Sequence, residues 1–403
     1  MNAGRRSWRL AALLAALAML GPFSVDMYLP AFPAIGREFG ASSIALQQTL
    51  SAYLFAFAFM MLWHGALSDA LGRRPIILGS LVLYALATLG CAIAGNIESL
   101  WLFRALQGVS AGVGMVVGRA IIRDRFHGPD AQRLMSQITL VFGIAPAVAP
   151  VLGGVLLNAL GWRSVFWTLL LMVGALLAWT ARSLPETLPP AARQTLRPRA
   201  LWRNYRAVVT RVDFLLLALI PALNFAAFFV YVAVAPAFLL NLVGVTTNGF
   251  AWLFVPMIAG IMIGATLSGR LAGRVSPKRT IRLGYALMFA GAALNLAIAW
   301  LVPPGVPWSI LPIMVYTVGT AVLTPTLMLM LLDLFPAQRG MAASLQGFVQ
   351  FALSGFNAGT IAPLLAHSVV ALALGMAGFT AASFALWLVY QRRARRELGQ
   401  WSP

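Results

Sequence analysis

Long apolar segments alternate along the whole chain with short turns that carry polar residues, glycine and proline. Most of these segments run for about 20 to 25 residues, the length that an α-helix needs to cross the hydrocarbon core of a bilayer. The pattern predicts twelve spans, at residues 9–33, 44–66, 75–95, 99–121, 134–158, 162–183, 213–239, 248–271, 280–302, 308–332, 340–365 and 368–390. We therefore expect an all-α polytopic membrane protein.

The longest polar stretch lies in the middle of the chain, at residues 184–212. It carries four prolines and six arginines, and so many cations are not tolerated in a membrane span. We expect an amphipathic cytoplasmic linker here, lying against the anionic inner surface of the membrane. It divides the chain into a six-helix bundle at residues 1–183 and a second six-helix bundle at residues 213–403.

Two weak internal repeats relate the halves. Leu67–Leu71 aligns with Leu267–Leu271, and each copy leads into a basic cluster. Gly143–Pro150 has a similar spacing to Gly355–Pro363, and each pair lies in the fifth span of its half. Repeats at the same position of both halves predict two pseudo-symmetric bundles with a cavity between them.

Composition and charge agree with this topology. Of the 403 residues 61% are hydrophobic and 10% are charged, and the mean hydropathy is +0.85. The formal net charge is +19, and 26 of the 29 Lys and Arg residues fall at one set of predicted helix ends. Cations concentrate on the cytoplasmic side of membrane proteins, so both termini are expected there. The charge is therefore a topology signal and does not indicate nucleic-acid binding.

Asp26 is the one acidic residue of ten that the pattern places inside a span. A carboxylate there costs on the order of 3 kcal/mol, so we expect it to face the bundle interior. We also expect it to gain and lose a proton near neutral pH. The alternative is a helix-end carboxylate that caps a local turn near Pro30.

Arg104 is the only cation predicted to lie inside a span. Its guanidinium does not deprotonate, so it needs a carboxylate, backbone carbonyls or water as a partner, and Asp26 is a candidate. An arginine beside Asp26 would set the threshold at which that carboxyl takes up a proton. The alternative is a structural role in which Arg104 ties helices together.

The segment Gly65–Pro75, GALSDALGRRP, is predicted to form a short cytoplasmic turn between the second and third spans. Asp69 is expected against the positively polarised amino terminus of a neighbouring helix. Arg73 and Arg74 are expected to pair with an acid at a cytoplasmic helix end, for which Asp124 is a candidate. Such pairs would hold the two halves together in one conformation and release them in another; alternatively, the residues only anchor the topology. We call this group of residues at the cytoplasmic side the inner gate. It comprises Gly65, Asp69, Gly72, Arg73, Arg74 and Asp124.

The fifth span contains APAVAPVLGG, at Ala145–Gly154. Its prolines interrupt backbone hydrogen bonding and its glycines permit close helix contact, so we expect a bent helix pressed against a neighbour in the other half. The alternative is a kink without a functional role. The residues of interest are Pro146, Pro150, Gly153 and Gly154.

These motifs resemble those of a known family. They are DMYLP (26–30), LQQTLSAYL (46–54), GALSDALGRRP (65–75), RALQG (104–108), Arg123-Asp124, APVLGG with GWRSVFW (161–167), and RGMAASL (339–345). Together they look like the drug/proton antiporters of the major facilitator superfamily, most closely the bicyclomycin/chloramphenicol-resistance (Bcr/CflA) subfamily.

The resemblance implies a major facilitator fold and a bacterial inner-membrane exporter driven by the proton gradient, without a cofactor. Asp26 and Arg104 are similar to the proton-coupling residues of the family, and Asp69 and Arg73 to its inner gate. Pro150 with Gly154 resembles the antiporter motif. The family usually has Gln, Pro and Arg where this chain has Met61, Ala66 and Ala70, so Arg74 is expected to supply more of the charge of the gate.

An amphipathic organic substrate would suit a cavity lined by aromatic rings and a few amides. The candidate lining residues on predicted cavity helices are Tyr28, Tyr53, Phe57, Asn224, Phe225, Phe228, Tyr231, Phe254, Tyr316, Phe356 and Asn357.

The sequence and this resemblance thus predict a monomeric proton-coupled antiporter, embedded in membrane lipid, that expels small amphipathic organic molecules. The main alternative is a dedicated exporter or importer of one metabolite, such as a sugar, an amino acid or a siderophore-like compound. A membrane enzyme would need a cluster of catalytic side chains or metal ligands, whereas the three histidines are scattered and Cys91 is the only cysteine. A receptor would be expected to carry a sizeable soluble domain for binding a partner, and the pattern of spans predicts none.

Overall fold

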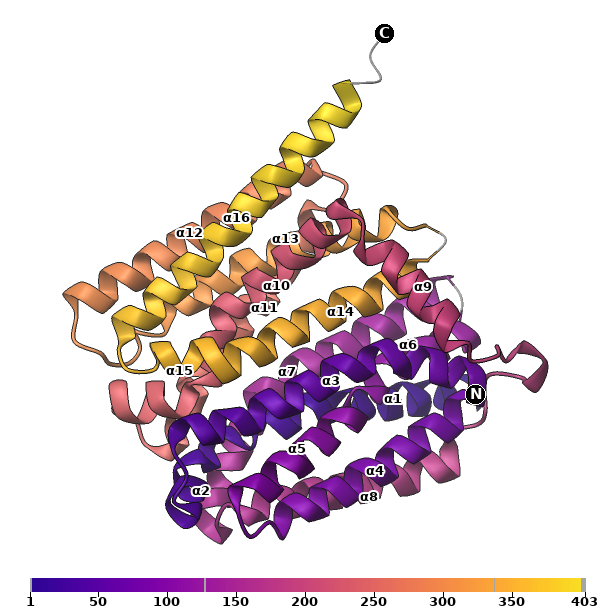
Figure 1. The fold of residues 1–403 in the computed structure, drawn as a ribbon, viewed down its shortest axis with the longest axis horizontal. Coiled ribbons are helices and arrows are strands. Elements are labelled where there is room, and N and C mark those ends of the chain that lie inside the picture. Colours follow the sequence, from indigo (N-terminus) through magenta and orange to yellow (C-terminus); the bar gives the residue numbers. More distant parts are fainter. Residues whose placement is uncertain (1, 127, 337, 400–403) are drawn as a thin grey trace. The chain divides into compact units, whose positions relative to one another are not determined.

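The computed structural model describes residues 2–126, 128–336 and 338–399, without the side chains of residues 2–8, 128–133, 136, 137, 139–142, 200, 247, 248 and 395–399 (Figure 1). Within those ranges the chain is helical and has no strand. The helices are α1 (Asn2–Asp26), α2 (Phe32–Phe39), α3 (Ser43–Leu71), α4 (Arg73–Ala92), α5 (Ile97–Ala111), α6 (Val113–Arg125), α7 (Gly128–Leu160), α8 (Arg163–Ser183), α9 (Pro198–Val209), α10 (Val212–Ala233), α11 (Ala251–Leu271), α12 (Pro277–Leu301), α13 (Leu311–Asp333), α14 (Arg339–Phe356), α15 (Ala362–Leu365) and α16 (Val369–Gly399).

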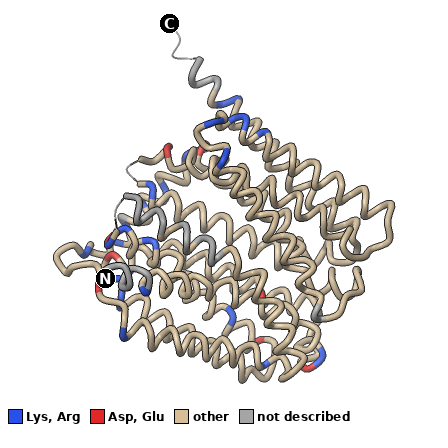
Figure 2. Tube along the Cα trace, turned by 180° about the vertical axis from the view of Figure 1, so that it is seen from behind, with Lys and Arg blue, Asp and Glu red and all other residues tan. Residues whose placement is uncertain are grey.

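Twelve segments among these residues are long and apolar enough to cross a membrane, which confirms the predicted number. They are Arg9–Phe39, Ser43–Leu71, Arg73–Ala92, Ile97–Arg125, Gly143–Leu160, Arg163–Ser183, Val212–Ala233, Ala251–Leu271, Pro277–Leu301, Leu311–Asp333, Arg339–Leu365 and Val369–Ala394. Within each half, the basic residues gather mainly at one end of the helices (Figure 2). This is the placement from which the topology was predicted.

The chain forms two compact units, Met1–Arg197 with Thr246–Ala251 and Pro198–Val245 with Trp252–Pro403. We call them the N-terminal and C-terminal halves. The break between Arg197 and Pro198 falls inside the segment predicted as a linker.

Corresponding helices pack together in each half. In the N-terminal half α1 packs on α7, and α4 packs on both α5 and α8. In the C-terminal half α10 packs on α14, and α12 packs on both α13 and α16. In both cases the first span meets the fifth and the third meets the fourth and sixth, as the internal repeats lead one to expect.

Besides the seventh, whose regular helix ends at Ala233 and is followed by a π-helical turn at Ala237–Leu242, three spans that the pattern predicts as single helices are interrupted. The first ends its regular helix at Asp26 and resumes through a short 3-10 turn, Leu29–Ala31, into α2. The fourth is broken at Gly112, between α5 and α6, and the eleventh contains a π-helical turn at Asn357–Ile361. Hydropathy cannot show such breaks, because the apolar run continues through all three.

Candidate functional site

A buried arginine lies at the centre of the N-terminal half. The side chain of Arg104, on α5, is 0% exposed, and its guanidinium carbon lies 4.7 Å from the ring centre of Tyr28 and 4.4 Å from that of Tyr53. A Cβ at Gly108, one turn further along α5, would overlap the backbone carbonyl of Tyr53. Glycine there allows α5 to approach α3 closely, which brings Arg104 and Tyr53 together.

Arg104 has fewer hydrogen-bond partners than it has donors. Its Nη1 donates to Oε1 of Gln107 at 2.7 Å, whereas Nε and Nη2 have no partner among the described residues. The Nε2 of Gln107 in turn donates to the hydroxyl of Thr88 at 2.8 Å. Sequence reasoning missed Gln107, although its place three residues after Arg104 in RALQG is a usable signal, because residues i and i+3 are neighbours on a helix.

Hydroxyl groups complete the surroundings of this arginine. The Tyr28 hydroxyl is hydrogen bonded to Oγ1 of Thr49 at 2.8 Å, and the hydroxyls of Ser24 and Tyr84 form a pair. The cation is thus enclosed by rings, an amide and hydroxyls, and no carboxylate of the described residues bonds to it. A desolvated cation between two aromatic faces gains about 2 kcal/mol, which offsets part of the cost of its burial.

Asp26, the last residue of α1, is 5% exposed. The suggested pairing with Arg104 is not formed: no hydrogen bond or ion pair joins Asp26 to any described residue. Nor does Asp26 cap the turn near Pro30, because its carboxyl is hydrogen bonded to no described residue. Tyr53 lies within electrostatic reach of both Asp26 and Arg104, so the two charges share a neighbour without touching.

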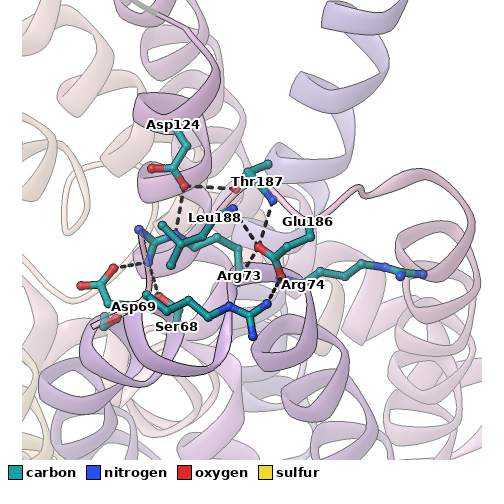
Figure 3. Close-up of polar contacts among 10 residues, drawn as sticks. Ser68, Asp69, Arg73, Arg74, Asp124, Glu186, Thr187 and Leu188 are labelled. Atoms are coloured by element: carbon teal, nitrogen blue, oxygen red, sulfur yellow. Dashed lines mark hydrogen bonds and ion pairs between the residues drawn. The ribbon is translucent and has the colours of Figure 1, made fainter. Parts of the chain in front are cut away.

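The predicted inner gate is a dense polar cluster at the turn between α3 and α4 (Figure 3). Arg73 donates through Nε to Oδ2 of Asp124 at 3.0 Å, and its Nη1 binds both Asp69 and the hydroxyl of Ser68. The predicted pairing of Arg73 with Asp124 is therefore confirmed. Gly72, which precedes Arg73, has a φ of 105°, a conformation that glycine adopts without strain.

Sequence reasoning missed the acid that organises this cluster. Glu186 lies at the start of the linker, and its carboxylate accepts hydrogen bonds from the backbone amides of Arg73 (3.0 Å) and Arg74 (3.3 Å), the first residues of α4. It also accepts from the amides of Thr187 and Leu188, each at 2.9 Å. Partial burial opposes ionisation of Glu186, but these amides outweigh it and hold its pKa below the usual value.

The cluster corrects two sequence-based expectations. The carboxylate at the amino terminus of α4 belongs to Glu186, whereas Asp69 is bound to Arg73. Arg74 supplies no acid pairing, because its Nη2 donates to the carbonyl of Ala181 and its Nε has no partner among the described residues. The partners described for the cluster all belong to the N-terminal half, so these pairs brace that half internally. That the gate also holds the two halves together in one conformation stays a prediction.

Helix α7 runs unbroken from Gly128 to Leu160 through both Pro146 and Pro150. Pro150, Gly153 and Gly154 are buried, and a Cβ at Gly153 would overlap the backbone of Met27. The contact seen at Gly153 lies within the N-terminal half, and a contact of this helix with the other half stays a prediction. Glycine lets α7 press against the interruption that follows Asp26.

The residues predicted to line a substrate cavity divide into two groups. Tyr28 and Tyr53 enclose Arg104, and the others that are fully or nearly fully buried are Phe57, Asn224, Phe228, Tyr231, Phe254, Tyr316 and Asn357. Phe225 is half-buried, with its ring packed on Phe228, and Phe356 is 47% exposed. Contact with a substrate remains a prediction for all of them.

The polar core of the C-terminal half is uncharged. Asn295 donates to the Tyr231 hydroxyl at 2.6 Å, and Tyr316 donates to the backbone carbonyl of Asn224 at 3.3 Å. Among the described residues, the buried Asp, Arg and His side chains are Asp26, His64, Arg73 and Arg104, all in the N-terminal half. The described residues contain no cluster of three or more potential metal ligands.

Comparison with known proteins agrees with this architecture. The profile described as Major Facilitator Superfamily matches residues 14–359. The chain is 33% identical over 306 residues to the chloramphenicol resistance protein of Pseudomonas aeruginosa, covering 73% of this chain and 70% of that one. It is 28% identical over 371 residues to a bicyclomycin resistance protein homolog of Haemophilus influenzae, covering 90% and 91%.

A solved structure with a similar fold is a bacterial homolog of the human lysosomal transporter Spinster, in an inward-facing and unoccupied conformation. The TM-score is 0.74 at 16% identity, with 100% of both chains covered. At this identity the likeness concerns the fold.

Proposed function

Because the chain belongs to the Major Facilitator Superfamily and is a membrane transporter, we propose that it is a proton-coupled antiporter that exports amphipathic drugs by alternating access between its two six-helix halves. The observation that carries the proposal is the pair of buried, oppositely charged side chains in the N-terminal half, Asp26 and Arg104. The two are not bonded to each other.

Asp26 is the group that titrates during transport. An acid inside a span is costly when ionised and unpaired, so its proton occupancy and the conformation of the half are linked. Arg104 keeps its charge throughout and has two free donors, Nε and Nη2. Those donors suit a carboxylate, so deprotonated Asp26 approaches Arg104 in another conformation and protonated Asp26 leaves it.

The substrate class rests on the relatives and on the chemistry of the C-terminal half. Two of the relatives are named for resistance to chloramphenicol and for homology to a bicyclomycin resistance protein, and both names refer to antibiotics. The buried polar groups of the C-terminal half are neutral amides and hydroxyls beside aromatic rings. Such surfaces recognise amphipathic molecules that carry uncharged hydrogen-bonding groups.

We place the transporter in a bacterial inner membrane, as a monomer with both termini in the cytoplasm. The bias of its cations supports this orientation, because 26 of 29 fall on one predicted side. Reporter fusions at the linker and at both termini test it. A reporter that places the linker on the outer side of the membrane would contradict the cytoplasmic position of the linker and of both termini.

Substrate-dependent proton release from purified protein tests the function directly. The protein is titrated in weakly buffered detergent solution with a diverse panel that includes chloramphenicol and bicyclomycin, and Asp26→Asn is the matched control. We expect release with several unrelated amphipathic compounds and none from the control. Release with a single sugar, amino acid or siderophore would favour a dedicated transporter, and binding without release by any compound would contradict antiport.

A further inference from the structure

Helix α9, Pro198–Val209, is a short helix in the linker region with two different faces. One face is covered: Val208 is buried, and the helix packs on α10 and α14 of the same half. The other face carries Arg199, Trp202, Arg203 and Arg206, and all four side chains are exposed. Their spacing of i, i+3, i+4 and i+7 places them along one side of the helix.

Nothing in the described part of the chain neutralises this face. The guanidinium groups of Arg199, Arg203 and Arg206 form neither an ion pair nor a hydrogen bond with the described residues. The sequence has no acidic residue between Glu186 and Asp213. Three cations on one short surface repel one another, and this cost is removed by a partner that carries negative charge.

Trp202 identifies the kind of partner. Its side chain is 71% exposed in the middle of the three arginines. Tryptophan is enriched where a protein meets the boundary between lipid headgroups and water, because its ring is apolar and its N–H is polar. Because the bases of single-stranded RNA also stack on exposed aromatic rings, the position of α9 along the chain has to decide between RNA and lipid.

The position of α9 along the chain favours a lipid partner. The helix ends at Val209, and the membrane-spanning helix α10 begins at Val212, with two residues between them. So short a connection keeps α9 close to the level at which α10 enters the bilayer. Its exposed face is therefore within reach of headgroups and not far out in the solvent.

We propose that the α9 face formed by Arg199, Trp202, Arg203 and Arg206 is a binding site for anionic phospholipid, in which the guanidinium groups hold headgroup phosphates and the indole inserts at the interface. The site ties the beginning of the C-terminal half to the membrane surface. It is independent of the transported substrate and of proton coupling.

The test uses the full-length protein in nanodiscs of phosphatidylcholine with increasing fractions of phosphatidylglycerol. Ala207 is exposed and lies on the flank of the face, and Cys91 is fully buried, so Ala207→Cys takes a spin label selectively. The measured quantity is the accessibility of the label to oxygen, which dissolves in lipid, relative to a water-soluble nickel chelate. We expect the label to move toward the lipid as the phosphatidylglycerol fraction rises.

Two triple variants separate a site from a general effect of charge. In the first, Arg199, Arg203 and Arg206 are changed to Gln, and we expect the apparent affinity for phosphatidylglycerol to fall by about fivefold for each arginine. In the second, Arg270, Arg274 and Arg279 are changed to Gln. These three are also exposed, lie in the same half and carry the same charge. We expect this control to respond like the parent.

Trp202→Ala should leave the response to phosphatidylglycerol in place and reduce the depth that the label reaches. Equal losses in the two triple variants, or no movement of the label with phosphatidylglycerol, would overturn the proposal. So would displacement of the label by RNA or by inorganic phosphate, because the partner would then be a soluble anion. None of these measurements depends on transport, so a failure of the lipid-site proposal is distinguishable from a failure of the antiport proposal.

Discussion

The carboxylate of Glu186 accepts a hydrogen bond of 3.0 Å from the backbone amide of Arg73, a residue 113 positions earlier in the chain. Through this bond the first segment of the linker caps helix α4, whose own N-cap residue, Gly72, has no side chain to do so. The same turn presents the Arg73 side chain to Asp69 and Asp124. Glu186 thus positions Arg73 within the inner gate.

Replacing Glu186 with Ala should lower the free energy of unfolding by about 1–2 kcal/mol, because amides at a helix terminus lose their acceptor. Thermal unfolding in detergent measures the change, and Glu98→Gln, at an exposed acid in the first turn of α5, is the control. A midpoint that shifts no more than that of the control would contradict the capping role.

The pH dependence of this contribution has a definite sign. The pKa of Glu186 is lowered in the folded protein, so its stabilisation is fully present above the ordinary pKa of a glutamate. It is lost only as the pH falls through the lowered pKa. Between mildly acidic and neutral pH the cap is constant, and any change of transport rate in that range arises from another group.

Gly72→Ala should be costly for two reasons that act at one position. The φ of 105° is a conformation that alanine avoids, at about 1–3 kcal/mol, and the added Cβ would lie 2.5 Å from Oε2 of Glu186. Gly79→Ala is the matched control, because Gly79 lies within helix α4 and a Cβ there meets no atom within 4 Å. We expect the control to be as stable as the parent or slightly more stable. Equal stability of both variants in thermal unfolding would refute the argument.

The number of spans was predictable because a membrane span is a run of consecutive apolar residues, which the sequence shows directly. The break after Asp26 was not, because an apolar run does not reveal where backbone hydrogen bonding stops. The role of Glu186 was not predictable, since no spacing rule connects it with Arg73 across 113 residues. The surroundings of Arg104 were misjudged because charge pairing is an obvious expectation, whereas two tyrosine rings carry no formal charge.

Asp69→Asn should weaken transport while leaving equilibrium binding of the substrate nearly unchanged. Asp69 is bound to Arg73 at the helix end, so its loss changes the relative stability of conformations and removes no contact with the ligand. Asp333→Asn is the control, because Asp333 forms an exposed pair with Arg339 that contributes little. Transport rates in vesicles and binding by calorimetry give the two quantities. A loss of binding as large as the loss of transport would exclude this role.

Arg104→Lys should reduce uphill transport by about 10- to 100-fold even though the charge is kept. Lysine cannot reproduce a planar cation between the rings of Tyr28 and Tyr53 while also reaching Gln107. Gln107→Leu should cause a smaller loss, because it removes one acceptor and leaves the rings in place. Drug efflux from inverted vesicles under an imposed proton gradient provides the measurement. Full activity of Arg104→Lys would show that only the charge matters.

The sharpest prediction concerns Asp26. If proton and substrate compete through this carboxyl, Asp26→Asn fixes a neutral side chain that resembles the protonated carrier and has no charge left to cycle. Uphill efflux should vanish, because a gradient cannot be coupled through a group that does not titrate. Binding of a neutral substrate should persist and lose its dependence on pH, since the aromatic and amide groups of both halves are unchanged.

Two further variants separate titration from packing. Asp26→Glu retains a carboxyl and moves it by about one methylene, so it should keep part of the activity with a shifted pH optimum. Glu98→Gln removes an exposed acid from the same half and should have no effect on coupling. The measurements are counterflow, which needs no gradient, and gradient-driven efflux across a range of pH. We expect Asp26→Asn to retain the first and lose the second. An Asp26→Asn protein that still exports uphill at the parent rate would show that this buried carboxyl is a structural residue, and the coupling proton would have to be sought elsewhere.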